Sequence, residues 1–123
     1  VTGRNRRCGW LDLVALKYAI MVNGVTQLIM MKSDVLDGFD SISVCTAYEK
    51  DGVQTTDMPY DTEGWKAVYE TLPGWKTNLT QMTSEEEFPQ QLRDYIAYIE
   101  KETSTPITIV SVGPDRAQTI IRK

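Results

Sequence analysis

Three arginines gathered near the start of the chain are the residues whose types and spacing best suit chemistry. Arg4, Arg6 and Arg7 lie within four positions, between Gly3 and Gly9. A guanidinium group is a planar fork of donors that binds phosphate or carboxylate through two bonds at once, and glycine lets backbone approach a ligand. The stretch predicts an anion-binding loop. The alternative is a solvated or disordered arm.

Two further polar stretches follow predicted strands. Residues 32–34 come after the apolar run 28–31, and residues 111–116 come after the apolar run 106–110. Open α/β sheets place ligands beyond the carboxyl ends of their strands. We therefore expect these two loops and the arginine loop to meet at one edge of the sheet.

The loop over residues 32–34 has the residue types for recognising a purine. The Asp34 carboxylate can accept parallel bonds from the N1–H and the exocyclic amine of guanine, whereas adenine presents an acceptor at N1. The stem of Lys32 can lie over the base. Main-chain groups of Ser111–Gly113 can close the other side, where a glycine avoids a clash. The alternative for Lys32 and Asp34 is a surface ion pair.

Length and composition narrow the class of protein. The 123 residues allow one domain, 1–123, and the net charge of -4 argues against a nucleic-acid partner. Without histidine, imidazole catalysis and histidine-ligated metals are excluded within the chain. Cys8 and Cys45 lack a C-x-x-C spacing, so we interpret both as free thiols in a reducing, cytoplasmic compartment. No apolar run reaches transmembrane length, so no membrane partner is expected.

Hydrophobic spacing gives the coarse order of elements. Apolar residues at three- and four-residue intervals predict a helix over 10–22, which is apolar nearly all round and therefore expected to be buried and central. A second, amphipathic helix is predicted over 89–102, after a capped start at 83–87. Strands are predicted over 25–31, 42–48, 67–72 and 106–110, the first covered on both faces, with an irregular stretch over 55–63.

These elements indicate an α/β class, mixed α+β within this chain, with strands and two main helices. Two helices cover both faces of a sheet poorly. The chain also opens on Val1-Thr2, in what resembles a working loop. We therefore expect a fragment that lacks an N-terminal part.

Four motifs resemble one family in its own order. The stretch T-G-R-N-R-R-C-G-W-L-D over 2–12 resembles the T-G-R-x-R-R-C-G-W-L-D stretch of adenylosuccinate synthetases, and K-S-D-V-L-D over 32–37 is similar to their K-L-D-V-L-D. L-P-G-W over 72–75 and G-P-D-R over 113–116 are similar to their late L-P-G-W and G-P-x-R elements. The whole chain resembles the C-terminal part of that family's P-loop-type fold.

The resemblance implies a ligase of purine nucleotide biosynthesis that joins IMP and L-aspartate with GTP and magnesium on the route to AMP, working as a homodimer. It implies that a loop over Val1–Arg6 (Val1, Thr2, Gly3, Arg4, Asn5 and Arg6) holds aspartate and IMP, with Arg4 reaching the IMP ribose. It implies that GTP is held by Arg6, Lys32, Ser33, Asp34, Ser111, Val112 and Gly113.

The sequence departs from the family at three positions. Val1 and Asn5 stand where a threonine and a basic residue are usual, and Ser33 replaces a leucine, which we expect to change packing only. The family's phosphate-binding glycine loop, catalytic aspartate, catalytic histidine and magnesium ligands belong to its N-terminal part. We therefore expect no catalytic residue, no metal ligand and no activity in this chain alone. The alternative is a stand-alone regulatory module that binds a nucleotide or another anion.

Overall fold

The computed structural model describes residues 9–122 and confirms the mixed α/β class. Within residues 9–122 there are two α-helices, three short 3-10 helices (η) and seven strands. Their bounds are β1 (Leu11–Asp12), α1 (Leu13–Asn23), β2 (Leu28–Met30), η1 (Ser33–Leu36), β3 (Ser41–Lys50), β4 (Val53–Thr55), β5 (Lys66–Pro73), η2 (Glu85–Glu87), α2 (Gln90–Thr103), β6 (Ile107–Ser111), η3 (Arg116–Gln118) and β7 (Thr119–Ile121).

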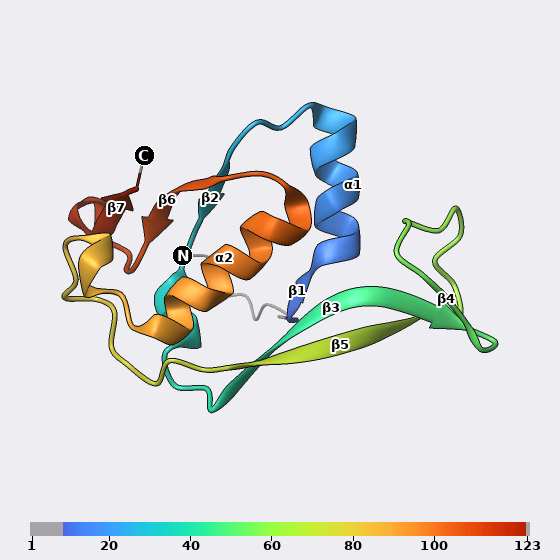
Figure 1. Cartoon of the computed structure of the whole chain (residues 1–123), viewed down its shortest axis with the longest axis horizontal. Coiled ribbons are helices and arrows are strands. Elements are labelled where there is room, and N and C mark those ends of the chain that lie inside the picture. Colours follow the sequence, from blue (N-terminus) through green and yellow to red (C-terminus); the bar gives the residue numbers. More distant parts are fainter. Residues whose placement is uncertain (1–8, 123) are drawn as a thin grey trace, which may run out of the picture.

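The strands form two sheets (Figure 1). In the first, the long strand β3 pairs parallel to β1 and antiparallel to β4 and β5. The β3–β5 ribbon extends past α1, as Figure 1 shows. In the second sheet, β2 pairs parallel to β6, and β7 pairs antiparallel to β6. Because β2 pairs parallel to β6, both strands end at the same edge of this sheet.

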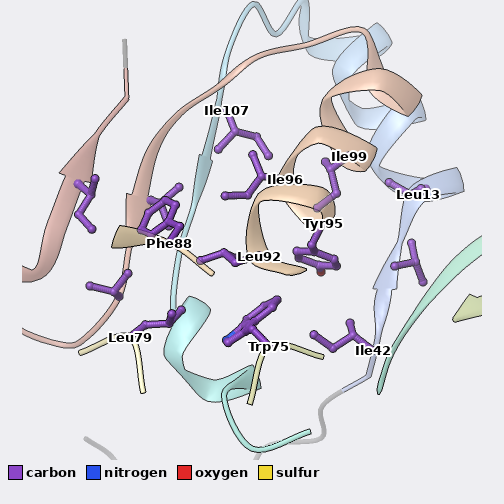
Figure 2. Packing of buried hydrophobic residues seen from close by; sticks show 14 residues of the cluster. Leu13, Ile42, Trp75, Leu79, Phe88, Leu92, Tyr95, Ile96, Ile99 and Ile107 are labelled. Carbon is purple, nitrogen blue, oxygen red and sulfur yellow. The ribbon is translucent and has the colours of Figure 1, made fainter. Parts of the chain in front are cut away.

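The core lies around α2, between the β3–β5 ribbon and the strands β2 and β6 (Figures 1 and 2). One face of α2 is apolar at helical spacing and is buried, as the predicted amphipathic pattern requires. It packs against Ile42, Trp75, Leu79 and Ile107 from three other segments. The rings of Trp75 and Tyr95 lie 5.7 Å apart. The contact therefore joins α2 to the connection that follows β5.

The predicted start of the first helix is wrong by one turn. Trp10 and Leu11 precede α1, and Leu11 pairs with Val44 as part of β1. Asp12 is the N-cap instead of a first-turn residue, and its carboxylate accepts the N–H of Ala15 at 3.1 Å. A capping aspartate satisfies a donor that the helix start leaves free, so α1 begins at the cap and not at the first apolar residue.

The predictions that α1 is central and that β2 is covered on both faces are also wrong for the described residues. Only Leu13 and Val14 of α1 are buried, whereas Met21 is 70% exposed. In β2, Ile29 is 55% exposed. The apolar composition is real, but within residues 9–122 nothing packs against these faces.

Two strands and two helix starts differ from the sequence expectations. The short strands β4 and β7 are not predicted by the sequence, because each adds three residues to the edge of a longer partner. Within the predicted stretch 83–87, only Glu85–Glu87 are helical, as the separate helix η2, and α2 begins at Gln90 behind Pro89. None of the helices within residues 9–122 combines the length and apolar character needed to cross a bilayer.

Candidate functional site

Two of the three predicted loops line one hollow. Because β2 and β6 run parallel, with Met30 opposite Val110, the residues that follow them emerge side by side. The hollow between them has a volume of about 580 Å³. Lys32 and Asp34 line one wall, and Ser111 and Gly113 line the other. The two described loops therefore meet as the sequence predicts, whereas the arginine loop, which was predicted to join them, lies outside the described residues.

The first wall is shaped by an uncommon backbone conformation at Lys32. This residue has φ 57° and ψ 38°, the left-handed region, although it is not a glycine. Its carbonyl accepts the N–H of Val35 at 3.2 Å, which opens η1. Asp34 follows in the first turn of η1 and is half-buried. Non-glycine residues held in such conformations cluster at ligand sites, because the surrounding structure has to hold them there.

The second wall is fixed by its own hydrogen bonds. The hydroxyl of Ser111, which is 5% exposed, donates to the carbonyl of Gly113 at 3.1 Å. A Cβ on Gly113 would lie 2.3 Å from the side chain of Gln118. The glycine therefore leaves room for Gln118 in its observed position, a reason that differs from the clearance for a base proposed above.

The other residues predicted to bind ligand do not line the hollow or lie outside the described part of the chain. Ser33 and Val112 do not line the hollow, since Ser33 is 2% exposed and Val112 is fully buried in the core. The N–H of Val112 donates to the carbonyl of Gln118 at 2.8 Å. The predicted residues Val1, Thr2, Gly3, Arg4, Asn5 and Arg6 lie outside the described residues.

The sequence predicted the loop over 111–116 but assigned no binding role to Pro114, Asp115 and Arg116, and it missed Met31, Val35 and Thr119 as lining residues. Arg116 adds a second cation to the hollow, and Met31 and Val35 add apolar surface. Arg116 was within reach of prediction because it ends the G-P-D-R motif. Met31 and Val35 were not, because isolated apolar residues beside a turn are common in core and surface alike.

The chemistry of the hollow suits a flat, polar ring that carries a negatively charged group. Its apolar side chains can pack on ring faces, one half-buried carboxylate can accept ring donors, and its cations can face an anion. No group of three or more His, Cys, Asp or Glu side chains within residues 9–122 is arranged to hold a metal ion.

A second polar cluster lies away from the hollow, at the start of α1. The hydroxyl of Tyr48 donates to the carboxylate of Asp12. Burial is the larger cause, and this bond the next, of a raised pKa at Tyr48. Burial and the neighbouring Asp12 carboxylate also raise the pKa of Cys45, whose thiol donates to the Ala47 carbonyl. A thiol with a raised pKa is a poor nucleophile, so we assign this cluster to packing. The prediction that Cys45 is free is confirmed, and Cys8 lies outside the described residues.

Comparison with known proteins gives a consistent result. A family model described as adenylosuccinate synthetase matches residues 1–120. The adenylosuccinate synthetase of Phocaeicola vulgatus is 63% identical over 123 residues, covering 99% of this chain and 29% of that protein. That of Parabacteroides distasonis is 59% identical with the same coverage.

The fold agrees with a solved structure as well. The structure of fully ligated adenylosuccinate synthetase from Plasmodium falciparum matches 99% of this chain with a TM-score of 0.93 at 34% identity. The match covers 30% of the Plasmodium chain. The chain thus spans somewhat under a third of the length of the proteins it matches. Both the sequence and the fold show that this chain belongs to the adenylosuccinate synthetase family.

Proposed function

We propose that this chain is the guanine-recognising, C-terminal part of a GTP-dependent ligase that joins IMP and L-aspartate. The observation that carries the proposal is the hollow shared by the loops that follow β2 and β6. In this proposal Asp34 accepts the N1–H and the exocyclic amine of guanine, and Lys32 covers the base with its stem. Main-chain groups around Ser111 and Gly113 close the opposite side.

The arginine loop is proposed to supply the anion contacts. Gly9, the first described residue after that loop, lines a second hollow of about 670 Å³ together with Val35. Val35 also lines the proposed guanine hollow. Gly9 and Val35 of η1 thus share one hollow, which supports Arg6, three residues before Gly9, as a contact for GTP. Thr2, Gly3 and Arg4 are proposed to hold the aspartate carboxylates, with Arg4 reaching IMP.

Uncovered apolar surface supports a further, N-terminal part of the same protein. A groove of about 320 Å³ runs beside β2 and is lined by exposed Ile29 and Met31. Ser33 also lines this groove, and its buried hydroxyl has no hydrogen-bond partner within residues 9–122. Strands of parallel sheets are normally covered on both faces. We propose that the rest of the polypeptide covers this groove, and that the whole enzyme is a cytoplasmic homodimer.

Catalysis is assigned to that further part. We propose that the 123-residue chain alone does not turn over GTP, IMP and aspartate, since it has no histidine and no phosphate-binding G-x-x-x-x-G-K loop. The measurement is product formation by the purified chain with all three substrates. Turnover above a no-protein blank would contradict this part of the proposal and favour a self-contained activity.

Asp34→Asn in the full-length protein tests the guanine assignment. Asparagine offers one oxygen and places an amine where the carboxylate accepted a bond, so one of two charge-assisted bonds is lost. Binding of GTP should weaken by about 2–4 kcal/mol, while KM for IMP stays unchanged. Equal weakening for IMP and GTP would contradict the assignment. A chain that binds diverse anions with no preference for guanine would favour a regulatory module instead.

A further inference from the structure

We propose that the segment Trp75–Thr80, between β5 and η2, sets the spacing of the two walls of the guanine hollow. In this proposal Asp37 and Gln118 are positioning residues, because they tie the two walls to that segment. The inference rests on the proposed function of the hollow. It concerns residues that do not line the hollow themselves.

The first tie holds the wall formed by η1. Asp37 follows η1 directly, and its N–H donates to the carbonyl of Asp34 at 3.1 Å. One oxygen of the Asp37 carboxylate accepts the indole N–H of Trp75 at 2.8 Å. The other accepts the main-chain N–H of Leu79 at 3.0 Å. Two bonds to one carboxylate fix both its position and its direction, so the end of η1 cannot shift without the segment.

The second tie holds the wall that follows β6. The amide of Gln118 donates to the carbonyl of Thr80 at 3.0 Å. The same amide accepts the N–H of Asp115 at 2.8 Å, within a capping box at the start of η3. Gly113 lacks the Cβ that would collide with this side chain. One side chain therefore joins the loop that contains Gly113 and Asp115 to Thr80.

The segment between the two ties is held rigidly. Leu79 is fully buried and Trp75 is 4% exposed, and both pack in the core under α2, as Figure 2 shows. The side chain of Asn78 accepts the N–H of Thr80 at 2.9 Å and its hydroxyl at 2.6 Å. A well-packed core transmits displacement instead of absorbing it. The two ties reach this segment at Trp75 and at Thr80, five residues apart. They therefore act on one rigid body.

The spacing matters because both walls have to contact one base. Guanine can contact Asp34 on one wall and the main chain of the other wall at the same time only if the distance between the walls matches the width of the base. A displacement of about 1 Å in a bound group can cost about a hundredfold in rate. Loosening either tie should therefore weaken recognition of the base, even though the loosened residue does not contact it.

The test uses the full-length protein with Gln118→Met and Asp37→Asn, and with Gln81→Met as the matched control. Methionine keeps the length of Gln118 and adds no charge, but it removes both amide hydrogen bonds. Gln81 is exposed and belongs to neither tie. The readouts are KM and kcat for GTP, KM for IMP, and the preference for GTP over ITP, which lacks the exocyclic amine that Asp34 accepts.

Both tie variants should raise KM for GTP about tenfold, since one to two hydrogen bonds are lost. They should reduce the preference for GTP over ITP, while KM for IMP matches the control. ITP and GTP carry the same phosphates, so a change in this preference reports on the base alone. If Asp37→Asn fails to fold, Gln118→Met carries the test, because Gln118 is only partly buried.

Two outcomes separate this inference from the proposed function. If Asp34→Asn lowers the preference for GTP but both tie variants match Gln81→Met, the spacing role is overturned and the guanine site stands. A uniform change in all kinetic constants would also overturn the spacing role, because it indicates general destabilisation. If Asp34→Asn itself leaves the preference unchanged, the guanine site and the inference built on it both fall.

Discussion

The indole N–H of Trp75 donates to the carboxylate of Asp37 at 2.8 Å, across 38 residues of chain. Trp75 is 4% exposed, so this bond is shielded from water. Replacing Trp75 with phenylalanine removes the donor and part of the packed ring. We expect Trp75→Phe to lower the free energy of unfolding by about 2–4 kcal/mol, measured by urea denaturation. A loss below that of a surface substitution would show that the bond contributes nothing to stability.

Gly74, the residue before Trp75, packs closely against the main chain of Phe39. A Cβ on Gly74 would lie 2.0 Å from the main-chain oxygen of Phe39. Because a main-chain atom cannot swing aside, Gly74→Ala should destabilise by about 3 kcal/mol or more. Gly38→Ala is the control, since nothing lies within 4 Å of its added Cβ. Equal midpoints of thermal unfolding for the two variants would contradict the predicted clash.

Arg122 joins three segments near the end of the chain. Its guanidinium contacts Glu85 at 2.9 Å and Glu100 at 3.2 Å, with 15% of the side chain exposed. Arg122→Met leaves two partly buried carboxylates without this cation, so we expect a loss of about 1–3 kcal/mol in unfolding free energy.

The control for Arg122 is an exposed ion pair in the same chain. Lys76 contacts Asp40 at 2.9 Å, but their side chains are 63% and 86% exposed. Water screens such a pair, so Lys76→Met should cost less than about 0.5 kcal/mol. Equal effects of the two substitutions on urea denaturation would show that burial of the Arg122 pairs does not matter.

The raised pKa of Tyr48 should make the free energy of unfolding depend on pH at alkaline pH. Burial and the bond to Asp12 raise its pKa above the ordinary value of 10.0. The neutral phenol is therefore favoured in the folded state, and its contribution is complete below about pH 10 and is lost as pH rises through the folded pKa. As pH rises above about 10, Tyr48→Phe should therefore lose less stability than the parent protein. Parallel curves of unfolding free energy against pH would contradict this.

Much of the fold is predictable because long elements carry periodic patterns. The helix α2 and the strands β3, β5 and β6 are correctly predicted, since each has a clear alternation or helical spacing. The start of α1 is not, because Trp10 and Leu11 extend its apolar pattern into a strand. The cap at Asp12, which decides the boundary, looks like any first-turn acid in the sequence.

In the candidate site, too, some features could be predicted from the sequence and others could not. Residue type and position after a strand are enough to select Lys32, Asp34, Ser111 and Gly113, and all four line one hollow. The bonds from Asp37 to Trp75 and from Gln118 to Thr80 could not be predicted. They join residues about 38 positions apart through contacts that only the packed core creates.

The central claim is that Asp34 selects guanine, and a change of base tests it most directly. Xanthine has a carbonyl where guanine has its exocyclic amine, so an asparagine at this position can donate to it and still accept the N1–H. In the full-length protein with Asp34→Asn, the ratio of kcat/KM for XTP to that for GTP should rise at least about a hundredfold over the parent, the range of two exchanged hydrogen bonds. An unchanged ratio would contradict the account.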